Sequence, residues 1–276
     1  MDSAAPKRAA RDAEHSTPFR ALARGGYAAN GLVHILIGGI ALAVALGARG
    51  MTDQSGALMA IAGVPYGFVL LWVIAVALCA LGLWQLLEGI LARGSTEDAQ
   101  GLAQRWGRRL GAWGQAVIFV ALGLIAAAVA LGARVDAEEA AENASAGLLS
   151  IPGGPIVLAL VGLGVGIGGI VFIAMGARRS FRRNIEIPRH GIGRGVAGLG
   201  LVGFIAKGIA LLIVGILLVF ASLRTDADTA GGLDGALRAL LQLFYGPALV
   251  AAVGTGFVAY GIFCLFRARF ARLEPA

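Results

Sequence analysis

The stretch that decides the fold is Gly-Tyr-Ala-Ala-Asn-Gly at residues 26–31, which is followed by Gly38. A second copy, Gly-Phe-Ile-Ala-Lys-Gly, occupies residues 203–208 and is followed by Gly215. The interval from the end of the copy to the next glycine is the same in both, from 31 to 38 and from 208 to 215. A segment that recurs with constant internal spacing predicts a repeated structural unit.

A third, more divergent copy lies in the middle of the chain. It reads Gly-Ala-Trp-Gly-Gln-Ala at residues 111–116 and is followed by Gly123. In the first and third repeats the repetition continues beyond the copy, since Gly-Ala-Leu at 56–58 and at 235–237 precedes a Tyr-Gly pair by the same interval. The sequence therefore predicts a polar tail and then three hairpin repeats, at residues 1–20, 21–92, 106–177 and 196–270.

Composition places these repeats in a membrane. Hydrophobic residues make up 58% of the chain and charged residues 14%, whereas a soluble domain carries about 25% charged residues. The apolar residues fall in runs close to the length that crosses about 30 Å of hydrocarbon as a helix. The runs are 26–48, 66–91, 112–132, 154–176, 198–222 and 245–267.

Each run is expected to form a helix because lipid cannot satisfy exposed backbone groups. Barrel strands would be runs of about ten alternating residues. Each repeat holds an even number of helices, so all copies begin on the same side, and an axis relating them runs along the membrane normal. The predicted fold is an all-α membrane protein with six transmembrane helices, arranged as three parallel-repeat helical hairpins with pseudo-threefold symmetry. Segments 55–63 and 233–244 are too short to span and are predicted to be short helices on the outer surface.

Basic residues are distributed unevenly between the two sides. Eighteen lie in the two tails and the second and fourth loops, four lie in the other loops, and Lys207 is inside a run. This asymmetry predicts that both termini are cytoplasmic, in a bacterial plasma (inner) membrane. It also explains the net charge of +7 by topology and attraction to anionic inner-leaflet lipids. Nucleic acid is not expected as a partner.

The paired-helix unit is present three times, and its first and third copies open with Gly-aromatic-x-Ala-x-Gly. This organisation resembles the bacterial membrane family called domain of unknown function 1206. The resemblance covers residues 20–270. It implies the architecture described above, and the family brings no activity or functional residues to this chain.

Six polar side chains inside the runs form a candidate polar membrane cluster. They are Asn30, His34, Gln85, Glu88, Gln115 and Lys207. An ionisable group at mid-membrane costs about 2.5–3.5 kcal/mol on insertion scales, which makes it a functional candidate. Three of the six occupy the same position of the three repeats and are expected at one depth around the axis: Asn30, Gln115 and Lys207.

The cluster has two interpretations. In the first, it lines a hydrated pocket open to the cytoplasm, where Glu88 or a backbone carbonyl meets the Lys207 ammonium and His34 takes part in a charge or proton site. In the second, Lys207 extends toward the headgroups, Glu88 pairs with Arg93 or meets headgroup water, and the amides are interhelical hydrogen bonds.

Enzymatic chemistry is not expected. His34 is the one histidine of three that lies within an apolar run, so bis-histidine haem ligation is not supported, and no cofactor or metal site is predicted. Cys79 and Cys264 lie inside runs at non-equivalent positions, which favours buried side chains over a disulfide. No hydrolytic set of serine, histidine and carboxylate is apparent.

Two functions remain open. The first is an integral membrane structural or accessory protein that packs with partner membrane proteins or lipids. The alternative is a small transporter or channel for a small solute or proton along the pseudo-threefold axis. Polar side chains that face a hydrated cavity would favour transport, and side chains that face neighbouring helices would favour packing.

The charge asymmetry makes the topology testable by labelling single cysteines with an impermeant thiol reagent. Label should reach cysteines placed at Asp53, Glu139 and Asp228 from outside the cell, and should not reach those placed at Arg108 and Arg182. The reverse pattern would overturn the predicted orientation.

Overall fold

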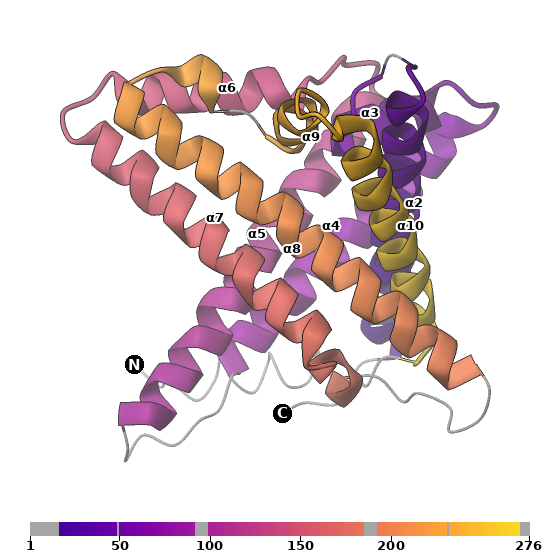
Figure 1. The fold of residues 1–276 in the computed structure, drawn as a ribbon. Coiled ribbons are helices and arrows are strands. Elements are labelled where there is room, and N and C mark those ends of the chain that lie inside the picture. Colours follow the sequence, from indigo (N-terminus) through magenta and orange to yellow (C-terminus); the bar gives the residue numbers. More distant parts are fainter. Residues whose placement is uncertain (1–16, 49, 92–98, 185–191, 231, 271–276) are drawn as a thin grey trace. The chain divides into compact units, whose positions relative to one another are not determined.

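The computed structural model describes residues 17–48, 50–91, 99–184, 192–230 and 232–270, and their regular elements are all helical. Six helices are long and apolar enough to cross a membrane. They are α2 (Thr17–Ala45), α4 (Gly67–Leu91), α5 (Ala99–Ala130), α7 (Gly154–Ala177), α8 (Ile192–Arg224) and α10 (Gly246–Phe270) (Figure 1). The predicted all-α membrane fold is therefore confirmed, and residues 1–16 of the predicted tail lie outside the description.

Shorter helices lie between the two long helices of each repeat. They are α3 (Gln54–Ala62), α6 (Ala137–Leu149) and α9 (Leu233–Leu241), the last preceded by the 3-10 turn η2 (Ala227–Thr229). A second 3-10 turn, η1 (Ser180–Asn184), lies between α7 and α8. The two predicted short helices correspond to α3 and α9. Helix α6 was not predicted from the sequence. Its N-cap is Asp136, whose side chain accepts hydrogen bonds from the Glu138 and Glu139 amides. Such a cap satisfies backbone donors that the first turn leaves open.

The described residues belong to two compact units. Unit 1 comprises residues up to Asn30, Ile61–Ala133 and residues from Leu265, and therefore holds the start of α2, α4, α5 and the end of α10. Unit 2 comprises Gly31–Ala60 and Arg134–Cys264, with the rest of α2, α7, α8 and most of α10.

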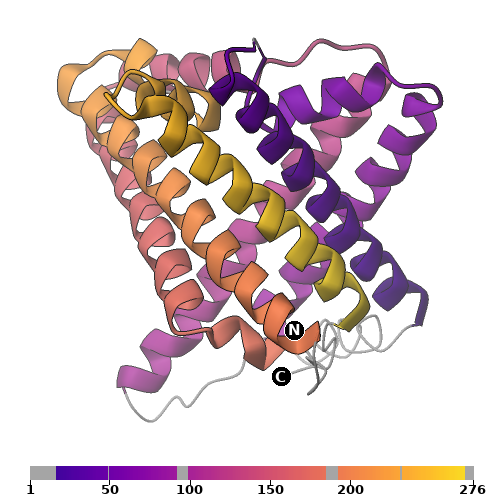
Figure 2. The same ribbon diagram turned by 45° about the vertical axis from the view of Figure 1, so that its right-hand side comes forward.

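In unit 2, α7 and α8 lie side by side with their backbones in close contact (Figures 1 and 2). A Cβ atom added at Gly169 would lie 2.6 Å from the Gly208 carbonyl oxygen, and one at Gly215 would lie 2.7 Å from that of Gly162. Contacts of this length leave no room for a side chain. Small residues at these positions let the helices pack by van der Waals contact, which drives association in lipid.

The same contact occurs between α2 and α10, which lie next to each other in Figure 2. A Cβ atom added at Gly261 would lie 2.5 Å from the Gly31 carbonyl oxygen, and one at Gly38 would lie 2.5 Å from that of Gly254. Both pairs lie within unit 2. The last helix of the third repeat therefore packs against the first helix of the first repeat.

In unit 1, α4 packs against α5 in this way. A Cβ atom added at Gly82 would lie 3.1 Å from the Ala116 carbonyl oxygen, and one at Gly123 would lie 3.0 Å from that of Ala75. Gly31, Ala116 and Gly208 are the aligned positions of the repeats, so the three junctions use equivalent residues. The second helix of each repeat packs against the first helix of the next, and the third junction returns to the first repeat.

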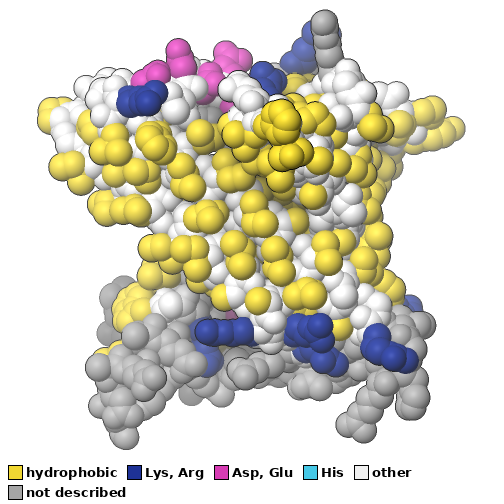
Figure 3. Space-filling model, viewed as in Figure 1, with side chains coloured by type: hydrophobic (Ala, Val, Ile, Leu, Met, Phe, Trp, Pro, Cys, Tyr) yellow, Lys and Arg dark blue, Asp and Glu magenta, His cyan; other side chains and the backbone are white. Residues whose placement is uncertain are grey.

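Charges separate toward the two ends of the spans. In the face shown in Figure 3, Asp and Glu side chains gather at the end that carries α6 and α9, where some Lys and Arg side chains also lie. Hydrophobic side chains cover the middle, and Lys and Arg side chains line the opposite end. Asp53 is buried, whereas Glu139 and Asp228 are exposed. The latter two are therefore the informative positions for labelling from the predicted outer side.

A matched pair of substitutions tests the glycine contacts. In Gly169→Ala the added methyl meets backbone atoms of α8 at 2.6 and 2.7 Å, so we expect the unfolding free energy to fall by about 1–3 kcal/mol. In Gly168→Ala the methyl meets nothing within 4 Å, and stability should not fall. Thermal unfolding in detergent measures both, and equal stability of the two variants would contradict the proposed junction.

Candidate functional site

The most polar site within the spans of unit 2 surrounds Lys207 on α8. The Lys207 Nζ atom lies 3.2 Å from the Nε2 atom of His34 on α2, and His34 is only 3% exposed. An ammonium group is a donor without an acceptor. A protonated Lys207 therefore donates to Nε2, and the neutral His34 ring then carries its own proton on Nδ1.

Aromatic rings enclose the same ammonium group. Lys207 Nζ lies 4.5 Å from the ring centroid of Tyr260 and 5.4 Å from that of Phe172, within the range of cation–π attraction. The His34 ring packs against Tyr260 and Phe257, with centroids 4.8 and 5.8 Å away. The arrangement can hold one positive charge and pass a proton between Nζ and Nε2.

Unit 1 contains a second polar contact between neighbouring helices. The Gln85 Nε2 group on α4 donates to Gln115 Oε1 on α5 at 2.6 Å. Gln115 and Lys207 are aligned positions of the repeats, and Gln85 and Phe172 each follow an aligned glycine by the same interval. The same junction position is therefore filled by an amide pair in one case and by an ammonium–aromatic contact in another.

The remaining candidates, Asn30 and Glu88, both belong to unit 1. Asn30 on α2 is 3% exposed. Glu88, in the last turn of α4, is exposed at the surface and interacts electrostatically with Arg267 of α10. The Arg267 guanidinium lies 4.3 Å from the Tyr27 ring centroid and donates to the Tyr27 hydroxyl at 3.1 Å.

The structure thus brings together two pairs of the predicted residues, His34 with Lys207 and Gln85 with Gln115. The predicted meeting of Lys207 with Glu88 stays a prediction, since the two residues belong to different units. Arg93, a predicted partner of Glu88, lies outside the described residues.

A buried polar cluster beside α3 and α9 was not anticipated. Asp234 is 2% exposed and accepts hydrogen bonds from the Thr52 amide and hydroxyl at 2.8 and 2.5 Å. It also forms an ion pair of 2.6 Å with Arg238. Asp234 therefore ties the segment before α3 to the first turn of α9.

Two further carboxylates belong to this cluster. Asp53 accepts from the Ser55 hydroxyl and the Gly56 amide, and burial raises the pKa of its carboxyl group. Glu138 accepts from the Gly232 amide at 2.8 Å, and burial raises its pKa as well. Asp53 directly precedes the first residue of α3 and accepts from the Gly56 amide, so it is the N-cap of that helix. An Asp at this position is a sequence signal for a helix start.

These carboxylates accept hydrogen bonds at the start of a helix or from a distant loop segment. Among the described residues, no three histidine, cysteine, aspartate or glutamate side chains come close enough to hold a metal ion together. Within that part of the chain, the polar sites are contacts between the protein's own helices and loops.

The chain is similar to a bacterial protein over most of its length. The chain is 29% identical over 245 residues to the "Uncharacterized protein YxxB" of Bacillus subtilis (strain 168), covering 88% of this chain and 87% of that protein. No solved structure matches the chain.

Three segments match a family described as Domain of Unknown Function (DUF1206), at residues 25–92, 110–179 and 202–271. They coincide with the three hairpins α2–α4, α5–α7 and α8–α10. The chain is a bacterial multi-pass membrane protein with three hairpin repeats, and it belongs to the DUF1206 family.

Proposed function

We propose that this protein is a structural or accessory component of the bacterial plasma membrane, with both termini cytoplasmic, that packs against partner membrane proteins and has no enzymatic activity. The observation that carries the proposal is the use of polar side chains within the spans. Gln115 bonds Gln85 on the adjacent helix, and Lys207 meets His34 and aromatic rings. These groups join helices of the chain itself, as expected of interhelical contacts in lipid.

The surface of α7 offers a place for a partner. In the most apolar 18-residue stretch of α7, 17% of the residues are buried inside the protein, against 56% in the corresponding stretch of α10. Large apolar side chains on this helix are well exposed, including Leu160 at 62% and Ile167 at 60%. Such a surface faces either lipid or another protein.

Two glycines give this surface the shape that a partner helix requires. A Cβ atom added at Gly164 or at Gly168 would meet nothing within 4 Å. The two residues are four apart, as neighbours on one helix face are, and glycines so spaced allow a second membrane helix to approach closely. We therefore propose that the partner contributes a transmembrane helix to this face, which we call the α7 outer face (Leu160, Gly164, Ile167, Gly168 and Val171).

Substitution at Gly164 tests the proposed docking. Gly164→Leu should leave thermal stability nearly unchanged, because its side chain enters open space, and should lower recovery of cross-linked partner by about tenfold or more. The measurement is cross-linking in native membranes followed by purification and identification of the attached proteins.

The matched control is Gly162→Leu, on the buried side of α7, where a Cβ atom would lie 2.9 Å from the Gly215 carbonyl oxygen. This variant should lose stability through the α7–α8 junction. If Gly164→Leu retained every cross-linked partner at the wild-type level, the α7 outer face would not be a docking surface.

The transport alternative is tested at Lys207. In Lys207→Met the buried His34 loses the hydrogen bond with Lys207, so we expect the unfolding free energy to fall by about 1–3 kcal/mol. Proteoliposomes that contain the wild type or the variant should show the same background proton flux under an imposed pH gradient and membrane potential. A wild-type flux above that of empty liposomes, abolished in Lys207→Met, would favour the transporter instead.

A further inference from the structure

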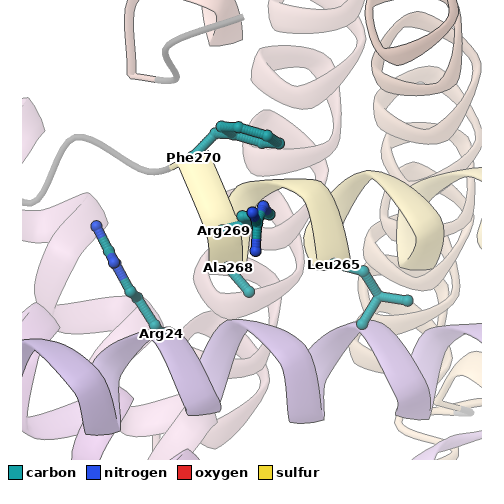
Figure 4. A pocket seen from close by; sticks show the side chains of 5 residues that line it. All are labelled: Arg24, Leu265, Ala268, Arg269 and Phe270. Atoms are coloured by element: carbon teal, nitrogen blue, oxygen red, sulfur yellow. The ribbon is translucent and has the colours of Figure 1, made fainter. Parts of the chain in front are cut away.

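We infer that the cytoplasmic end of unit 1 carries a binding site for the phosphate headgroup of an anionic glycerophospholipid, between α2 and α10. An open pocket of about 560 Å³ lies there, lined by Arg24 of α2 and by Leu265, Ala268, Arg269 and Phe270 of α10 (Figure 4). This site does not depend on the proposed docking at α7, which lies in unit 2.

Two arginines supply the positive charge of the pocket. Arg24 projects from α2 and Arg269 from α10 (Figure 4), and both side chains are exposed. Within the described ranges, neither guanidinium has a carboxylate partner, because the ion pair found there joins Arg238 and Asp234. Guanidinium groups bind phosphate oxygens through paired N–H donors, so two of them facing one pocket are suited to a phosphate.

A neighbouring contact joins the two helix segments that carry these arginines. Arg267 precedes Arg269 by two residues on α10, and it stacks on the ring of Tyr27, which follows Arg24 by three residues on α2. The Arg267–Tyr27 hydrogen bond of 3.1 Å therefore ties the two helix segments together beside the pocket. A site held in place in this way loses less conformational freedom when it binds a ligand.

The location of the pocket selects a lipid over a soluble phosphate. Arg24 lies in the first turn of the apolar span Ala21–Ala45, and Arg269 lies in the last turn of Gly246–Phe270. Leu265, one turn before Arg269, is 42% exposed and points toward α2, while Phe270 points away from it (Figure 4). A phosphate at the arginines would therefore have its acyl chains beside apolar side chains. Basic pockets between spanning helices on the cytoplasmic side are suited to anionic headgroups.

Lipid titration of the purified full-length chain in detergent tests the site by native mass spectrometry. The wild type should bind one phosphatidylglycerol more tightly than phosphatidylcholine with the same acyl chains. In the variant that combines Arg24→Gln with Arg269→Gln, phosphatidylglycerol affinity should fall about 30-fold. Both side chains are exposed, so the variant should keep the thermal stability of the lipid-free protein.

A matched control removes the same charge elsewhere. Arg178→Gln combined with Arg182→Gln alters two exposed arginines on the predicted cytoplasmic side, outside the pocket lining, and should reduce affinity less than threefold. The variant that combines Arg24→Lys with Arg269→Lys keeps the charge but loses the paired donors, and its loss of phosphatidylglycerol affinity should be intermediate.

Equal losses in the Arg24/Arg269 and Arg178/Arg182 variants would show diffuse attraction to the charged end and would overturn the site. Displacement of the lipid by millimolar inorganic phosphate would show that the pocket binds free phosphate, which would overturn the assignment to a lipid. Neither result would bear on the α7 outer face, whose cross-links are measured separately.

Discussion

Close approach of helix backbones is the constraint on which the rest of this structure depends. In lipid, apolar side chains gain little by leaving one apolar environment for another, so helices associate through tight packing and through hydrogen bonds. Gly169 against Gly208, and Gly261 against Gly31, place one backbone within contact distance of the next. These junctions determine which side chains of neighbouring helices meet, and hence which polar groups can be paired.

The polar residues of the spans follow from that geometry. Gln115 and Lys207 lie one residue before the small residues of their junctions, at Ala116 and Gly208. Each is therefore carried against the neighbouring helix, where one meets Gln85 and the other meets Phe172. The third helix in contact with Lys207 is α2, which contributes His34. A position repeated in sequence has thus acquired different chemistry at different junctions, while the close contact beside it is retained.

The sequence was sufficient to predict the parts of the fold that rest on regular spacing. Runs long enough to span, and glycines at equal intervals such as 31 to 38 and 208 to 215, predict helices and repeats because lipid restricts the backbone and packing restricts side-chain size. The contact of His34 with Lys207 could not be predicted in this way, because it joins residues 173 positions apart, in the first and third repeats. The burial of Asp234 could not be predicted either, because it depends on the approach of Thr52 from a distant segment. α6 was missed because the middle repeat lacks the Gly-Ala-Leu element that marked the other short helices.

The third junction, between α2 and α10, has a consequence for biosynthesis. Among the six spanning helices described, α2 is made first and α10 last. Gly31 and Gly38 of α2 can therefore contact Gly254 and Gly261 only after α10 has been synthesised. The other two junctions join consecutive helices, α4 with α5 and α7 with α8, and can form as soon as the second helix of each pair is inserted. A nascent chain would therefore hold α2 in the bilayer with this face uncovered until α10 has been inserted. Contacts between distant parts of a chain also form late because their loop-closure cost is larger. A chain truncated before α10 would therefore leave the glycine face of α2 without its α10 contact in the bilayer.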